Sequence, residues 1–63
     1  MPVVNVQMWE GRTKEEKAEV AKASADDLVR ILKCRQESIT IIFSDVKKEN
    51  WAKGGTLACD LGM

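Results

Sequence analysis

Histidine is absent from this sequence, and cysteine occurs only twice, as Cys34 and Cys59. The two cysteines form no C-x-x-C pair, whereas protein zinc sites need cysteine and histidine ligands at close spacing. We therefore expect no structural metal. With no histidine to raise its thiolate fraction, each cysteine is expected to be a small reduced hydrophobe rather than a nucleophile.

The sequence also lacks an excess of charge and a long apolar run. Ten basic and ten acidic residues cancel, so no long-range field attracts nucleic acid or an anionic membrane. No apolar stretch approaches the length of a membrane span, and no secretory signal is recognisable. We expect a cytoplasmic protein that binds neither nucleic acid nor membrane.

A chain of 63 residues is expected to form one domain over residues 1–63. A domain of this size buries too little surface to be comfortably stable alone, and disulfides, a metal or association usually supply the difference. Because reduced thiols and no metal are expected here, association with other subunits is the remaining way to bury more surface. We expect an oligomer.

The first half of the chain predicts a strand followed by a long helix. In residues 3–8, the side chains of Val4, Val6 and Met8 alternate as in a strand with one buried face. Thr13 and Glu16 then form a capping box, and neither glycine nor proline follows from Lys14 to about Lys33. Apolar and small residues at helical spacing predict the buried face of this helix: Val20, Ala21, Ser24, Ala25, Leu28, Ile31 and Leu32.

The second half predicts another strand and a hairpin. Residues 39–43 are β-branched, aromatic and nearly continuous in apolarity, which is typical of an interior strand. A helical connection between two strands makes them parallel, with a right-handed crossover. Gly54 and Gly55 suit a tight hairpin turn. The expected fold class is α+β: a single βαβ unit with a small C-terminal hairpin, whose uncovered faces require neighbouring subunits.

The sequence opens with Met1-Pro2. Initiator methionine is generally removed before a residue as small as proline, and removal leaves a secondary amine. An α-amino group titrates near pH 8, and an apolar pocket beside a cation would lower its pKa toward neutrality, where a general base works best. Pro2 is therefore a candidate base. The alternative is that Met1-Pro2 merely begins a strand, where proline is tolerated.

The order of these features resembles the 4-oxalocrotonate tautomerase family over nearly the whole chain: Met1-Pro2, a short strand, Glu10-Gly11-Arg12-Thr13, one long helix, a second strand, Trp51 and Gly54-Gly55. The resemblance implies a tautomerase without a cofactor that forms a hexamer, a trimer of dimers. It further implies that the proline amine moves a proton between the enol oxygen and a distant carbon of an unsaturated 2-hydroxy acid.

Carried over by position, Pro2 would be the acid/base and Arg12 would bind a substrate carboxylate, for which a planar guanidinium is well suited. Trp51 occupies the aromatic position that would exclude water from the amine. The alternatives are a surface arginine before a helix and a tryptophan that packs the hairpin against a neighbour.

Two residues depart from the family archetype. Thr40 stands where the archetype carries a second arginine on strand two, and threonine cannot neutralise a carboxylate. Arg35 is a candidate replacement. Trp9 stands where the archetype has a smaller aliphatic residue, so two indoles would line the pocket. Both changes favour a compact monoacid enol, including an aryl-bearing one, over an extended diacid.

Two other functions are open. The chain would be a companion subunit without turnover if a second subunit of a hetero-hexamer brought the missing arginine. It would hydrate or dehalogenate an unsaturated acid if a carboxylate activated water beside the proline, and Asp45 and Glu49 are the candidates because they lie near Trp51 in the sequence.

Overall fold

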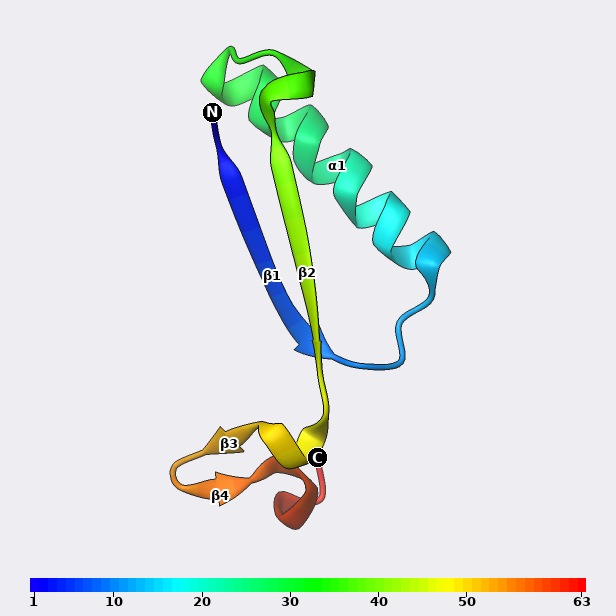
Figure 1. Cartoon of the computed structure of the whole chain (residues 1–63), viewed down its shortest axis with the longest axis vertical. Coiled ribbons are helices and arrows are strands. Elements are labelled where there is room, and N and C mark those ends of the chain that lie inside the picture. Colours follow the sequence, from blue (N-terminus) through cyan, green and yellow to red (C-terminus); the bar gives the residue numbers. More distant parts are fainter.

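The computed structural model describes all 63 residues as a βαβ unit followed by a C-terminal arm (Figure 1). The elements are β1 (Val3–Trp9), α1 (Lys14–Leu32), β2 (Thr40–Val46), β3 (Ala52–Lys53) and β4 (Thr56–Leu57), with short 3-10 turns at Gln36–Ser38, Lys48–Asn50 and Ala58–Leu61. β1 and β2 are parallel, and Val3 lies opposite Thr40. The expected α+β fold with a βαβ unit and a terminal hairpin is confirmed.

Helix α1 begins at the predicted capping box. The Thr13 hydroxyl accepts from the Glu16 main-chain N–H at 3.1 Å, and the Glu16 carboxylate accepts from the Thr13 N–H at 2.9 Å. Two of the N–H groups that a helix start leaves without partners are thereby satisfied. The helix ends at Leu32, and the next residue, Lys33, caps it: its backbone is left-handed (φ 57°) and its N–H donates to the oxygen of Val29.

One face of the two-stranded sheet is turned toward α1. Val4, Val6 and Met8 are half-buried, while their neighbours Val3 and Asn5 are exposed, so the predicted alternation is confirmed. Strand β2 has the same pattern, and Ile42 on its outer face is 46% exposed. An interior position was expected for this strand, but within the chain β1 is its only neighbour.

The prediction of which residues of α1 are buried is only partly correct. Ala21, Ser24, Ala25 and Leu28 are half-buried, but the chain leaves three larger members exposed: Val20 (41%), Ile31 (60%) and Leu32 (55%). Two strands spaced about 4.8 Å apart are roughly as wide as one helix, so they cover a single stripe of it. The rest of the apolar stripe has no cover.

The C-terminal arm, residues 47–63, extends beyond the end of the sheet (Figure 1). Its β3 and β4 form the predicted antiparallel hairpin, and the turn needs glycine because both Gly54 and Gly55 have positive φ. The molecule measures 43 × 24 × 13 Å, and its radius of gyration is 14.8 Å. A compact domain of this length would have about 11 Å.

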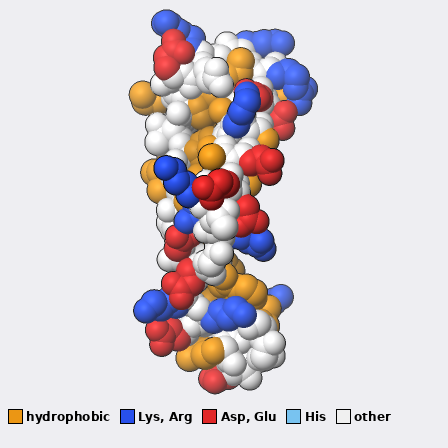
Figure 2. Space-filling view, turned by 90° about the vertical axis from the view of Figure 1, so that its right-hand side faces the viewer, with side chains coloured by type: hydrophobic (Ala, Val, Ile, Leu, Met, Phe, Trp, Pro, Cys, Tyr) orange, Lys and Arg blue, Asp and Glu red, His pale blue; other side chains and the backbone are white.

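This elongated chain has almost no interior of its own. Ala58 is its one buried residue, and the accessible surface is 4950 Å². A compact monomer of the same mass would expose roughly 4,000 Å². Figure 2 shows hydrophobic side chains at the surface between charged ones along the molecule. None of the helices combines the length and apolar character that crossing a lipid bilayer demands.

Candidate active site

Pro2 and Thr40 lie together at the end of the sheet where both strands begin. The main-chain oxygen of Pro2 accepts a hydrogen bond of 3.1 Å from the main-chain nitrogen of Thr40. Pro2 is half-buried, whereas Met1 is 95% exposed. With Met1 attached, the Pro2 nitrogen belongs to an amide and is not basic, so this end holds a potential base that only removal of Met1 would release.

Trp9, Trp51 and Arg12 lie at the opposite end of the sheet. Pro2 precedes the seven residues of β1 and Arg12 follows them. At about 3.3 Å per residue, the strand separates these two positions by roughly 25 Å. The five predicted site residues therefore form two groups within one chain, Pro2 with Thr40 and Arg12 with the two tryptophans.

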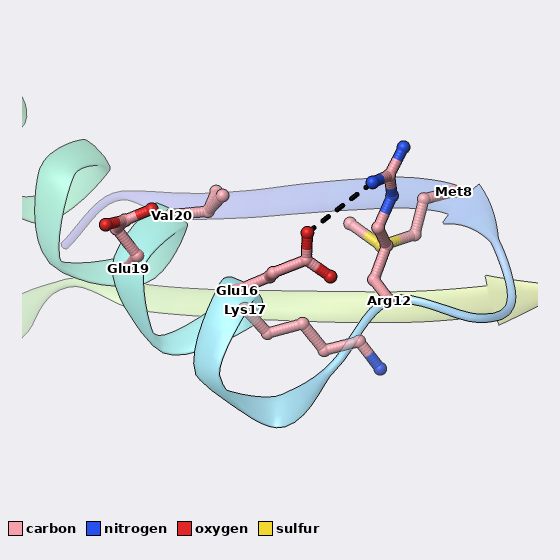
Figure 3. A pocket seen from close by; sticks show the side chains of 6 residues that line it. All are labelled: Met8, Arg12, Glu16, Lys17, Glu19 and Val20. Carbon is pink, nitrogen blue, oxygen red and sulfur yellow. Dashed lines mark ion pairs between the residues drawn. The ribbon is translucent and has the colours of Figure 1, made fainter.

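Arg12 is held by the start of α1. Its guanidinium lies 3.5 Å from the carboxylate of Glu16, which also completes the capping box (Figure 3). The main-chain hydrogen bond from Thr13 lowers the pKa of the Glu16 carboxyl, and the charge of Arg12 lowers this pKa further. The Arg12 side chain is 67% exposed and open to a ligand.

The two tryptophans pack edge to face, as aromatic pairs prefer. Their ring centroids are 5.8 Å apart at an angle of 73°. The Nζ of Lys48 lies 4.9 Å from the Trp9 ring centroid, within cation–π range. The Trp9 Nε1 is buried without an acceptor. An unsatisfied buried donor costs about 1–3 kcal/mol, so an acceptor from a ligand or another subunit would stabilise this cluster.

Lys48 was not among the site residues predicted from the sequence, although it lies beside Trp9. It lines a pocket of about 340 Å³ together with Arg12 and Trp9. The other lining residues are Met8, Glu10 and Gly11. Its position three residues before Trp51 was a usable signal, since one turn of a 3-10 helix brings residues at that spacing to one side.

The other candidate side chains are engaged elsewhere. Arg35, the suggested replacement for the absent arginine, lies 3.1 Å from Glu37 and is 85% exposed. Asp45, a candidate water activator, forms an ion pair with Lys17 of α1. The second such candidate, Glu49, lies 4.0 Å from Lys47. None of the three lines the pocket at Trp9.

The chain is similar to known proteins over nearly its whole length. A family model described as "Tautomerase enzyme" matches residues 2–60. The 2-hydroxymuconate tautomerase of Comamonas testosteroni is 34% identical over 62 residues, which cover 98% of this chain and 98% of the relative.

Two solved structures have the same fold over nearly their whole length. One comes from a study of the 4-oxalocrotonate tautomerase isozymes of Methylibium petroleiphilum, with a TM-score of 0.88, 32% identity, and coverage of 98% of this chain and 100% of that chain. The other is from a heterohexamer 4-oxalocrotonate tautomerase of Chloroflexus aurantiacus J-10-fl, with a TM-score of 0.87, 28% identity, and coverage of 97% and 98% respectively.

Proposed function

Because the chain belongs to the 4-oxalocrotonate tautomerase family of the tautomerase superfamily, we propose that it is a tautomerase of small unsaturated 2-hydroxy acids, with the amine of Pro2 as general base and acid. The observation that carries the proposal is the family match, which begins at residue 2, the residue that removal of Met1 would make the first.

The proposed reaction consists of two proton transfers, one from the substrate to the amine and one from the amine back to the substrate. The neutral Pro2 amine takes the proton of the enol hydroxyl, and the oxygen lone pair forms the new carbonyl. The electron pair of the carbon–carbon double bond takes a proton from the protonated amine at the far end of the unsaturated system, which in an arylenolpyruvate is the carbon next to the enol carbon. No co-reactant is needed, because the amine ends as it began.

The pKa of this amine decides whether it works near neutral pH. An ordinary α-amino group titrates at about 7.7–8.0, so a small decrease makes it largely neutral in the cell. Pro2 is already half-buried within one chain. Further burial against a neighbouring subunit and a cation such as Arg12 would both disfavour its protonated form.

The active site needs more than one copy of the chain. Pro2 and Arg12 lie at opposite ends of β1, so an arginine from a second copy must face the proline of the first. The exposed apolar residues of α1 and the outer face of the sheet provide the contact surface for such copies. A homo-hexamer, a trimer of dimers, is the assembly we propose.

The substrate is a compact monoacid. Thr40 brings no charge to the Pro2 end, so the site has one cation fewer than the archetype for a second carboxylate. Trp9 and Trp51 add two indoles in edge-to-face contact, which suit a flat unsaturated group. An aryl-bearing enolpyruvate fits this pattern better than an extended diacid.

The experiment that tests this function is ketonisation of phenylenolpyruvate and of 2-hydroxymuconate by protein of known intact mass. Protein without Met1 is expected to turn over the aryl substrate, while protein that retains Met1 is expected to be inactive. Failure of fully processed protein on both substrates would overturn the proposal.

A second candidate function is that of a companion subunit. It is favoured by the uncharged Thr40 and by the structural likeness to a subunit of a heterohexamer. The distinguishing outcome is recovery of activity only when a second, arginine-bearing subunit is added to fully processed protein. Hydration would instead add the mass of one water molecule to the product, whereas tautomerisation leaves the mass unchanged, and mass spectrometry distinguishes the two.

A further inference from the structure

Lys48 is a cation that lines the pocket at Arg12 and Trp9, at a site proposed to bind carboxylates. It pairs with none of the side-chain carboxylates of the chain, in contrast to its neighbour Lys47, which lies 4.0 Å from Glu49. Its Nζ donates one hydrogen bond to the main-chain oxygen of Met63 and faces the Trp9 ring. An ammonium has three N–H donors, so donors remain for a ligand.

Arg12 lines two pockets, and their charges differ. The pocket of about 250 Å³ on the α1 side contains two carboxylates, Glu16 and Glu19 (Figure 3). Its second cation, Lys17, is paired with Asp45. An anion entering there would meet like charge.

The pocket on the arm side is better suited to an anion. It contains Arg12, Lys48 and a single carboxylate, that of Glu10. It also contains Trp9, whose indole offers a flat apolar surface beside the two cations. Charge and shape together therefore favour this side of Arg12 for an unsaturated acid.

We propose that Lys48 is a substrate-binding residue, which together with Arg12 holds the single carboxylate of an aryl-bearing or similarly flat monoacid against Trp9. Lys48 adds a second cation at the Arg12 end, whereas Thr40 leaves the Pro2 end without one. The inference rests on the proposed function and specifies the substrate class of the same site.

The test measures binding and turnover separately. Binding of trans-cinnamate, a flat monoacid, is followed by fluorescence of Trp9 and Trp51, the only tryptophans of the chain, in protein carrying Pro2→Ala. Turnover of phenylenolpyruvate is measured in protein with Pro2 intact. Both measurements are made with Lys48 unchanged and with the three variants Lys48→Met, Lys48→Gln and Lys48→Arg.

The matched control is Lys47→Met, which removes the same charge from the adjacent position but does not touch the pocket. Lys48→Gln retains a donor for the Met63 oxygen, so it carries the test if Lys48→Met disturbs the arm. Size-exclusion chromatography and thermal unfolding of each variant report the assembly and the fold.

We expect Lys48→Met and Lys48→Gln to weaken cinnamate binding and to raise the KM for phenylenolpyruvate, each roughly fivefold, with little change in kcat. Lys48→Arg should restore both values, and Lys47→Met should leave them unchanged. Cyclohexanecarboxylate, which is not flat, should bind more weakly than cinnamate to every variant.

Unchanged cinnamate affinity and KM in folded Lys48→Gln protein would overturn this inference while leaving the proline mechanism intact. An equal loss in Lys47→Met would also overturn it, since the effect would then be one of general charge. Absence of turnover in processed wild-type protein that still binds cinnamate through Lys48 would instead overturn the proposed function.

Discussion

The main-chain oxygen of Pro2 accepts a 3.1 Å hydrogen bond from the main-chain nitrogen of Thr40, which ties the proposed base to the first residue of β2. The bond uses the carbonyl of Pro2 and leaves its nitrogen without a structural role. The start of the chain is therefore held in place by a group that plays no part in the proposed proton transfer.

Replacement of the proline should accordingly separate chemistry from folding. Pro2→Ala keeps the carbonyl that accepts from Thr40 but replaces the secondary amine with a primary one. We expect kcat to fall roughly a hundredfold, the contribution typical of a positioned general base. The melting temperature should change little. Stopped-flow ketonisation and thermal unfolding of mass-verified protein provide the two measurements.

A decrease in melting temperature that parallels the loss of kcat would argue for a structural role of Pro2 instead. Val3→Ile, which changes the next residue but keeps an apolar side chain on the outer face of the sheet, is the control for a general disturbance of the N-terminus. It should retain the amine and most of the activity.

Mixing Pro2→Ala subunits with Arg12→Ala subunits should restore part of the activity that each variant alone has lost. The reason is that Pro2 and Arg12 lie at opposite ends of one chain, so a site takes them from two copies. In a mixed assembly of Pro2→Ala and Arg12→Ala subunits, half of the prolines and half of the arginines are intact. A site built from two copies would then recover up to roughly a quarter of wild-type activity, one half multiplied by one half. Mixing after dissociation and reassembly, followed by a turnover assay, measures the recovery.

No recovery would mean that both residues act from the same copy, against the geometry of β1, or that one of them is not needed. The control is each variant mixed with itself under the same protocol. Reassembly is confirmed by native mass spectrometry with one subunit isotopically labelled.

Acid should selectively weaken the start of α1. The main-chain hydrogen bond from Thr13 and the charge of Arg12 lower the pKa of Glu16 in the folded state. A lowered folded-state pKa contributes stability that is fully present above the unfolded value of about 4.3 and is lost as the pH falls through the folded value. The contribution of the Glu16 carboxylate to the stability of the fold should therefore be constant near neutral pH.

The measurement is the melting temperature of wild-type protein and Glu16→Gln between pH 7 and pH 3. Wild-type protein should be the more stable above pH 5, and the difference should shrink as the pH falls below the ordinary glutamate range. Glu15→Gln, also in the first turn but outside the capping box, should show a smaller pH-dependent difference. Equal behaviour of the two variants would contradict the role of the box.

The outer face of the sheet should be a subunit contact. Ile42 is 46% exposed on that face and Val3 is 55% exposed. A lysine at an exposed position normally changes stability by less than about 0.5 kcal/mol, but at a packed interface it leaves a buried charge. Ile42→Lys should therefore dissociate the assembly and lower its melting temperature. Sedimentation velocity checks this, with Gln36→Lys in an exposed turn as control.

Local features were predictable from the sequence because they depend on residues close along the chain. Thr13 and Glu16 are three residues apart and sufficed to place the start of α1. Gly54 and Gly55 sufficed for the hairpin, since the two positive φ values of its turn favour glycine at both positions. The alternating apolar residues of β1 indicated which face turns toward the helix.

Features set by the path of the whole chain were not predictable in the same way. Ile31 and Leu32 fit the apolar stripe of α1, but their exposure depends on how narrow a two-stranded sheet is. The approach of Lys48 to Trp9 depends on how the chain turns after β2. The charge pattern of the sequence did not distinguish Lys48 from Lys47, although only Lys48 lines the pocket at Trp9.

Ala58 is the one residue that the chain buries by itself. The stability of the protein should therefore depend on its concentration in the cell. If several copies must meet before apolar surface is covered, the assembled fraction rises more steeply than the amount synthesised. Halving gene expression would then remove more than half of the working sites, and overexpression would protect variants that fail at natural dosage.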